Sequence, residues 1–227
     1  MEKDLLGILI MFGPIEVIAF DLDNTLYEEA LYFQSVFKCA SEALGFDCEL
    51  AFDFNRDMIE NDDDILGNFL KRIGRYSLAA QAKLFEGYKY SRITLELDHE
   101  KRMFLRKVRS KFKICILTNG VIEAQENKIR ALNIEELFDE VFYARFDGVA
   151  YEKPHPKAFQ RICDYFACSP EDVLFVGDHP ISDIRGAKEF GMRAVWTSEY
   201  SSRTETPLEA DMHICSLLEL SRVVEVA

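Results

Sequence analysis

Strands and helices alternate through the second half of the chain, and this alternation limits the fold more than any other feature of the sequence. Short apolar runs predict strands, and the longer segments between them have helical periodicity. Such alternation predicts a doubly wound, Rossmann-like parallel sheet of the α/β class. The predicted strands cover residues 113–117, 140–143, 173–177 and 193–197, and the predicted helices cover about 121–132, 155–167 and 181–190.

A further strand precedes this region, and a long interval separates the two. The apolar run from Ile15 to Phe20 predicts a buried strand. About 90 residues then pass before the next predicted strand, although a parallel crossover of roughly a dozen residues would suffice. The interval has helical periodicity and no convincing strand. We therefore expect an all-helical domain inserted between the first and second strands.

Two carboxylates follow the first predicted strand, in the sequence Asp21-Leu22-Asp23-Asn24-Thr25. Side chains two apart on a strand share a face, so Asp21 and Asp23 can converge while Leu22 turns into the core. One carboxylate can then act as a nucleophile and the other as a general acid and base, a division of roles that displacement at phosphorus can use. The plain alternative is an Asp-rich turn after a strand.

Three further polar motifs occur just after predicted strands or in the loop beyond them. In an open parallel sheet the carboxyl ends of the strands share one edge, where ligands bind. We therefore expect all four motifs to meet at that edge. The three are Thr118-Asn119-Gly120, Glu152-Lys153-Pro154, and Gly177-Asp178 with Asp183 five residues on.

Together, DLDNT, LTNG, EKP and GDHPISD resemble the motifs of the haloacid dehalogenase (HAD) superfamily, over Ile15 to about Thr197. The resemblance implies an α/β core with a helical cap between the first two motifs, which closes over the active site. On this basis we expect a core of residues 15–26 and 100–227 and a cap of residues 27–99. Residues 1–14 are expected to be an N-terminal extension, with an added strand or helix packed on the core as the alternative.

A carboxylate that attacks a phosphate ester brings two anions together, so a positive charge is needed between them. Like charges ~4 Å apart repel by roughly 4 kcal/mol even at an effective dielectric constant near 20. Hard oxygen ligands favour Mg2+, and Asp21 and Asp178 are the expected ligands. The resemblance adds the backbone carbonyl of Asp23. Asp183 is expected to orient a metal-bound water or Lys153.

The other motifs supply expected contacts to the phosphoryl group. The Thr118 hydroxyl and the backbone N–H of Asn119 are expected to hold phosphoryl oxygens, and Gly120 permits close approach of the backbone. Lys153 supplies the remaining positive charge and is expected to be catalytic together with Asp21, Asp23 and Thr118.

An acid two residues after the nucleophile resembles the phosphatases and phosphomutases of the superfamily. We expect phosphomonoester hydrolysis through an aspartyl-phosphate on Asp21, with Asp23 protonating the leaving oxygen and later activating water. The substrate is expected to be a small phosphorylated metabolite, either a sugar phosphate or a nucleoside monophosphate. A phosphomutase with the same Asp pair and a non-catalytic phosphate-binding protein on the same fold are the alternatives.

The residues that would select the substrate are less defined. Tyr27, Glu28, Tyr32 and Phe33 follow the nucleophile loop and are candidates to face the substrate, with packing inside a cap helix as the alternative. His179, beside Asp178, is interpreted as a loop residue and not as an acid–base group.

Charge and cysteine content limit the partners and the compartment. The formal net charge of −13 argues against nucleic acid as the main partner. The local exception is basic residues at 99–113, interpreted as an amphipathic helix with a solvated basic face and with Met103, Phe104 and Val108 on its apolar side. No membrane partner is expected, and we expect a monomer or homodimer. Six scattered Cys favour reduced thiols and a cytoplasmic location.

Overall fold

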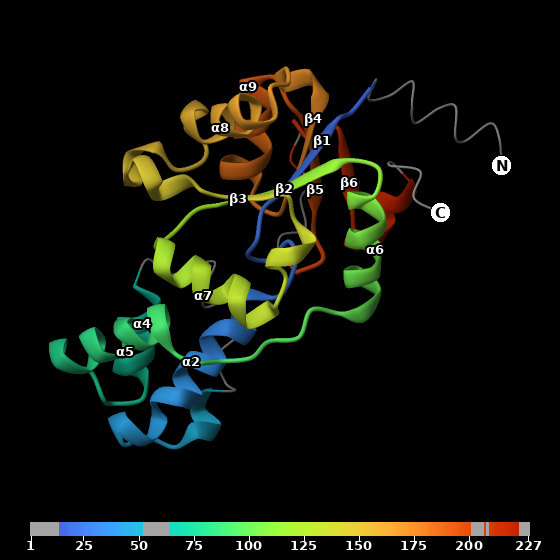
Figure 1. Ribbon diagram of the computed structural model, residues 1–227. Coiled ribbons are helices and arrows are strands. Elements are labelled where there is room, and N and C mark those ends of the chain that lie inside the picture. The colour runs from blue at the N-terminus through green and yellow to red at the C-terminus, as the bar shows by residue number, and fades with distance from the viewer. Residues whose placement is uncertain (1–13, 52–63, 201–206, 208, 223–227) are drawn as a thin grey trace. The chain divides into compact units, whose positions relative to one another are not determined.

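The computed structural model describes residues 14–51, 64–200, 207 and 209–222 (Figure 1). Its centre is a sheet of six parallel strands in the order β3-β2-β1-β4-β5-β6. The expected doubly wound parallel sheet is therefore confirmed. The strands are β1 (Val17–Phe20), β2 (Lys113–Thr118), β3 (Glu140–Tyr143), β4 (Val173–Gly177), β5 (Arg193–Thr197) and β6 (Met212–Ile214).

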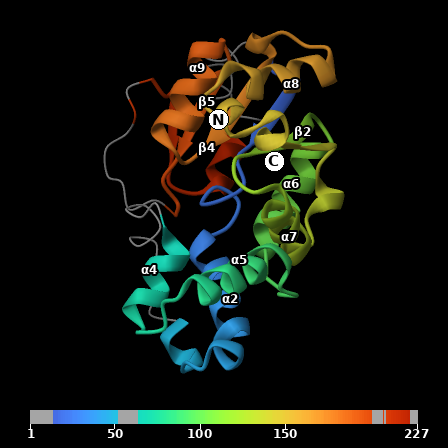
Figure 2. The same cartoon turned by 90° about the vertical axis from the view of Figure 1, so that its left-hand side faces the viewer.

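Two helices pack beside the sheet and close one hydrophobic core. These are α8 (Pro156–Phe166) and α9 (Gly186–Phe190), which lie together in Figures 1 and 2. Alternate residues of β1, β2, β4 and β5 point toward them, as the two-residue period of a strand requires. The rings of Phe159 and Phe175 meet edge to face with centroids 5.4 Å apart. Both faces of β1 are buried, which is typical of a central parallel strand.

Helix α6 (His99–Arg109) begins at its N-cap Asp98, whose side chain accepts from the backbone N–H groups of Glu100 and Lys101. Phe104, Leu105 and Val108 are its buried apolar residues. The solvated basic face expected for this segment is only partly correct, because Lys101 is buried. The Lys101 Nζ lies 2.6 Å from the Glu199 carboxylate and also contacts the Tyr200 hydroxyl. Met103, expected on the apolar side, is 42% exposed.

The chain divides into two compact units, of which the sheet and its helices form the first. The second comprises residues 28–96 and 121–133. Its secondary structure is helical, with no β-strand among its described residues. The helices of this unit are α2 (Glu29–Leu44), α4 (Ile65–Arg72), α5 (Leu78–Tyr90) and α7 (Ile122–Leu132).

Aromatic stacking and a buried ion pair hold the second unit together. The rings of Phe37 and Phe69 stack with centroids 3.7 Å apart. The Lys128 Nζ is fully buried and lies 2.7 Å from the Glu29 carboxylate, so α7 is tied to α2. The expected cap range of residues 27–99 did not include α7. Because Lys128 belongs to this buried pair, α7 packs with the second unit.

Shorter helical turns complete both units. No helix in the part of the chain described above is long and apolar enough to cross a membrane, and all six cysteines are free of disulfides. The 3-10 helices are η1 (Cys48–Ala51), η2 (Glu135–Leu137), η3 (Ala144–Asp147), η4 (Val149–Tyr151), η5 (Pro170–Asp172) and η7 (Leu217–Arg222), and the π-helix is η6 (Pro180–Arg185).

Two elements differ from the sequence expectation. The helix expected at 181–190 is the π-helix η6 followed by α9, and β6 was not expected. The expected extension lies almost entirely outside the described residues, which begin at residue 14.

Candidate active site

The polar residues of three of the four motifs lie at the carboxyl ends of three neighbouring strands. Asp21 follows β1, Thr118 ends β2, and Asp178 follows β4. From β1 the chain continues to β2 and β3 on one side of β1, and it then crosses to β4 on the other side. Asp21 and Asp178 therefore flank the point where the strand order reverses. Ligands bind at such a point in open α/β sheets. The backbone N–H of Asp21 donates to the Val176 carbonyl at 2.9 Å, which fixes Asp21 against β4.

A buried lysine joins two of the expected site carboxylates. The Lys153 Nζ lies 2.6 Å from Asp21 Oδ1 and 2.7 Å from Asp183 Oδ1. All three side chains are almost completely buried. Burial of a charge is costly unless the charge is paired, and here both carboxylates are paired with the same ammonium. Asp183 thus contacts Lys153, one of the two groups that it was expected to orient.

The pKa values of the triad follow from burial and from the neighbouring charges. Burial raises the pKa of Asp21 to about 7, and Lys153 opposes this shift while Asp183 and Asp23 add to it. Burial lowers the pKa of Lys153, but the carboxylates of Asp183 and Asp21 outweigh burial and raise this pKa above its usual range. Lys153 is therefore an ammonium cation at neutral pH. A second cation at the site would favour the ionised form of Asp21.

Glycine is required before Asp178 because the Asp183 side chain occupies the adjacent space. A Cβ at Gly177 would lie 2.5 Å from Asp183 Oδ2. The Asp183 carboxylate also accepts the backbone N–H of His179 at 3.0 Å. The His179 ring accepts the backbone N–H groups of Ile181 and Ser182. His179 therefore caps η6, in agreement with its interpretation as a loop residue.

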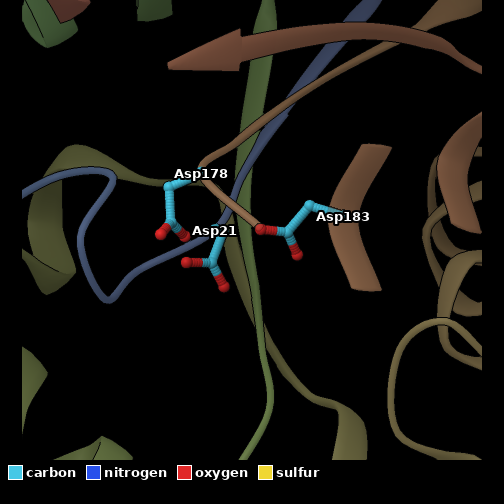
Figure 3. A group of neighbouring side chains, drawn as sticks. All are labelled: Asp21, Asp178 and Asp183. Atoms are coloured by element: carbon cyan, nitrogen blue, oxygen red, sulfur yellow. The ribbon is translucent and has the colours of Figure 1, made fainter. Parts of the chain in front are cut away.

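Three carboxylates converge on one space at this edge (Figure 3). One oxygen each of Asp21, Asp178 and Asp183 lies within 4.8 Å of the others. Closely grouped carboxylate oxygens are the donors that a hard cation such as Mg2+ prefers, so the donor set fits this ion. The backbone carbonyl of Asp178 accepts the Trp196 Nε1–H at 2.7 Å, which anchors its loop to β5.

Asp23 lies at the edge of the same region and is partly exposed, whereas Leu22 is fully buried. This is the alternation expected after β1. Asn24 has a φ of 55°, a left-handed conformation that Asn tolerates better than most residues. The Tyr27 hydroxyl donates to Asp23 Oδ1 at 2.7 Å. Sequence reasoning placed Tyr27 among residues facing the substrate and missed this contact.

The loop after β2 is bonded to the loop that carries Lys153. The Asn119 amide makes a reciprocal pair: its Oδ1 accepts the Lys153 N–H and its Nδ2 donates to the Lys153 carbonyl, both at 2.9 Å. The Thr118 hydroxyl, which is buried, donates to the Asn119 carbonyl at 3.3 Å. The Gly120 N–H donates to Glu152 at 2.6 Å. Gly120 has a φ of 106°, which a residue with a side chain rarely adopts.

Two of the candidate substrate residues are used inside the second unit. The Tyr32 hydroxyl donates to the Tyr88 carbonyl and accepts from the Asn127 amide. Phe33 is buried and its ring stacks on that of Tyr88, with centroids 5.3 Å apart. Both residues therefore take the packing role given as the alternative.

The six-stranded parallel sheet defines an α/β protein, and it has carboxylates and a buried lysine at the edge where such sheets bind ligands. Comparison with known proteins identifies the family. Residues 15–191 match the haloacid dehalogenase-like hydrolases. The chain belongs to this family, which confirms the resemblance found in its motifs.

One relative covers nearly the whole chain. The glyceraldehyde 3-phosphate phosphatase of Pyrococcus furiosus is 31% identical over 229 aligned positions, which cover 93% of both chains. Among solved structures, a HAD phosphatase from Thermococcus onnurineus has a TM-score of 0.61 at 26% identity, covering 93% of this chain and 98% of that chain. The magnesium-bound HAD hydrolase YfnB from Bacillus subtilis has a TM-score of 0.72 at 18% identity, covering 94% and 100%, and this likeness concerns the fold alone.

Proposed function

We propose that this protein is a Mg2+-dependent phosphatase that hydrolyses phosphate monoesters of small metabolites. The observation that carries the proposal is the convergence of Asp21, Asp178 and Asp183 with the Lys153 ammonium at the carboxyl edge of the sheet. The phosphatase relative described above supports the reaction type. No contact among the described residues favours either alternative, a phosphomutase or a non-catalytic phosphate-binding protein.

Asp21 is proposed as the nucleophile. Its carboxylate oxygen forms a bond to phosphorus while the bond from phosphorus to the leaving oxygen breaks, giving an aspartyl-phosphate. Asp23 protonates the leaving oxygen, and Tyr27 orients Asp23 for this step. The Asp23 carboxylate then takes a proton from the water that attacks the aspartyl-phosphate. Inorganic phosphate leaves and Asp21 is regenerated.

Positive charge makes this attack possible. Lys153, the Thr118 hydroxyl and the backbone N–H of Asn119 are proposed to bind the phosphoryl oxygens, and Gly120 is proposed to let the backbone approach them closely. Asp21 and Asp178, with the Asp23 carbonyl, would hold Mg2+, which when bound neutralises charge on the phosphoryl group. Asp183 holds Lys153 in position and is near enough to the other two carboxylates to assist at the ion.

The second unit is proposed to be a cap domain. It is helical, it is composed of residues 28–96 and 121–133, and its first segment directly follows the nucleophile loop in sequence. Hydrogen exchange of residues 64–96 with and without the phosphate analogue BeF3- tests this proposal. We expect slower exchange in the presence of the analogue, and unchanged exchange would contradict it.

The proposal also covers the cellular location, the oligomeric state and the partners of the enzyme. The six free cysteines favour a reducing, cytoplasmic location. We propose a monomer or homodimer with no nucleic-acid or membrane partner. Light scattering coupled to size exclusion chromatography measures the oligomeric state directly.

Phosphate release is the experiment that tests the function. Glyceraldehyde 3-phosphate, sugar phosphates, nucleoside monophosphates and p-nitrophenyl phosphate form the panel, each with Mg2+ or with EDTA. We expect release that requires Mg2+ and is lost in Asp21→Asn. Conversion of a sugar 1-phosphate to its 6-phosphate without release would instead establish a mutase. Equal rates in Asp21→Asn and wild type would exclude Asp21 as the nucleophile.

A further inference from the structure

The carboxylate of Glu152 sits between a backbone donor and an arginine, beside the residues proposed to bind phosphate. Its Oε1 accepts the Gly120 N–H at 2.6 Å and the Arg145 Nε–H at 2.8 Å, and its Oε2 accepts from Arg145 Nη2 at 3.2 Å. Only 15% of the Glu152 side chain is exposed. The two-point contact with Arg145 fixes the orientation of the carboxylate and also balances its negative charge.

The contact with Gly120 does not act alone. Residues Glu152 and Lys153 together make three hydrogen bonds to Asn119 and Gly120: one through the Glu152 carboxylate and two through the Lys153 backbone. The loop that follows β2 is thereby joined to the loop that carries Lys153. Because Lys153 Nζ lies 2.6 Å from Asp21, a shift of one loop changes the position of the ammonium relative to the nucleophile.

A carboxylate next to a phosphate-binding loop is unfavourable unless its charge is compensated. Arg145 supplies this compensation in the structure. The pair can therefore fix Gly120 without adding net negative charge where a phosphate dianion must bind. A neutral side chain could fill the same space, but it could not hold both the Gly120 N–H and a guanidinium in a two-point contact.

We propose that Glu152, held by Arg145, is a positioning residue for phosphoryl transfer. It keeps residues 118–120 and Lys153 in a fixed position relative to each other. This inference rests on the proposed phosphatase function. Neither residue needs to touch the substrate. Misplacement of catalytic groups by about 1 Å can cost roughly 100-fold in rate, so the effect is expected in catalysis more than in folding.

A similar carboxylate at the other end of β2 provides a matched control. Asp139 accepts the Ile114 N–H at 2.9 Å near the start of β2 and pairs with Arg109 at 3.3 Å. The exposed fractions of the Arg109 and Asp139 side chains, 39% and 22%, are similar to the 31% and 15% of Arg145 and Glu152. Both carboxylates thus hold one backbone N–H and one arginine, but only Glu152 adjoins the site.

The experiment compares Glu152→Ala, Glu152→Gln and Arg145→Gln with Asp139→Asn. The measurements are kcat and KM for p-nitrophenyl phosphate, the inhibition constant of inorganic phosphate, and Tm. We expect Glu152→Ala to lower kcat about 10- to 100-fold, the range seen when a supporting partner of an active-site group is removed. Glu152→Gln should recover part of this loss, because its amide oxygen can still accept the Gly120 N–H. Arg145→Gln should weaken phosphate inhibition.

The control decides between positioning and general stability. Asp139→Asn should lower Tm by an amount similar to that for Glu152→Gln and leave kcat within about 2-fold of wild type, because Asp139 contacts the end of β2 that lies away from the site. A wild-type kcat in Glu152→Gln and Glu152→Ala would overturn the inference. So would an equal loss of kcat in Asp139→Asn. Loss of activity in Asp21→Asn tests the proposed function separately, in the same assay.

Discussion

At the scale of single residues, the site is organised around a cation that the protein supplies itself. Lys153 is buried between Asp21 and Asp183 at 2.6 and 2.7 Å. Two carboxylates this close to each other would otherwise repel. The ammonium therefore allows an acidic site to be built into a buried position before any ligand arrives. The sequence motif indicated that Lys153 is functional, but not that it bridges these two carboxylates.

The hydroxyl of Tyr27 is expected to matter for catalysis. It donates to Asp23 at 2.7 Å, and a hydrogen bond to a charged group contributes about 1.5–3 kcal/mol. Tyr27→Phe should therefore lower kcat roughly 10-fold or more, with little change in KM. The control is Tyr165→Phe, which removes an exposed hydroxyl that bonds to Glu140. Equal kcat in Tyr27→Phe and wild type would contradict the orienting role.

Mg2+ should stabilise the folded protein against heat. An ion that binds only the folded state at about 100 times its Kd adds about 2.7 kcal/mol, and 1 kcal/mol shifts Tm by about 2–4 °C at this chain length. We expect a rise in Tm of several degrees in wild type and a much smaller rise in Asp178→Asn. Differential scanning calorimetry measures both. Asp164→Asn, an exposed substitution on α8, should behave like wild type. A full shift in Asp178→Asn would exclude Asp178 as a ligand.

At the scale of elements, sequence pattern located the strands of the first unit well. The predicted bounds of β3, β4 and β5 are those of the structure, because each is a compact apolar run flanked by turn residues. The three-residue strand β6 gives too short a pattern to recognise. The π-helix η6 was also missed, since hydrophobic periodicity does not separate it from the α-helix that follows.

The candidate site was predictable to a similar extent. Asp21 and Asp178 follow strands and Thr118 ends one, so the topology of a parallel sheet brings them together. The contacts of Tyr27, Glu152 and Trp196 could not be predicted. They depend on which side chains meet across loops, and no spacing in the sequence encodes that.

The thiols of β2 and α8 should differ in reactivity from those on the surface. Cys115 and Cys163 are buried, and burial raises the pKa of Cys163 to about 12 and that of Cys115 well above its usual value. The thiolate is the reactive form, so at pH 8 we expect N-ethylmaleimide to modify the exposed Cys39 and Cys215 first. Peptide mass spectrometry identifies the modified sites. After unfolding in guanidinium chloride all six should react, whereas rapid labelling of Cys115 in the folded protein would contradict the buried position of β2.

At the scale of the whole molecule, the net charge of −13 opposes the binding of a phosphorylated substrate. The positive charge proposed to bind phosphate is local, at Lys153 and a bound cation. Long-range repulsion is screened by salt, whereas a contact inside a buried site is screened much less. The two effects can therefore be separated by ionic strength.

Salt is expected to increase kcat/KM for a doubly charged sugar phosphate. At constant, saturating Mg2+, raising NaCl from about 20 to about 200 mM shortens the Debye length to less than 10 Å, so we expect an increase of about 2-fold or more. The value of kcat serves as the internal control, because it describes the enzyme after the substrate has bound. A fall in kcat/KM with salt would show that the substrate experiences a net attractive field.

Trp196 is the one tryptophan of the chain, and its indole nitrogen donates to the backbone carbonyl of Asp178. Its emission therefore comes from a single, fully buried ring in contact with the loop that carries a proposed metal ligand. Ion binding and loop rearrangement can be followed by stopped-flow fluorescence on the unlabelled protein. The chain thus carries an intrinsic fluorescent probe beside the loop of Asp178, where the steps of the catalytic cycle can be timed.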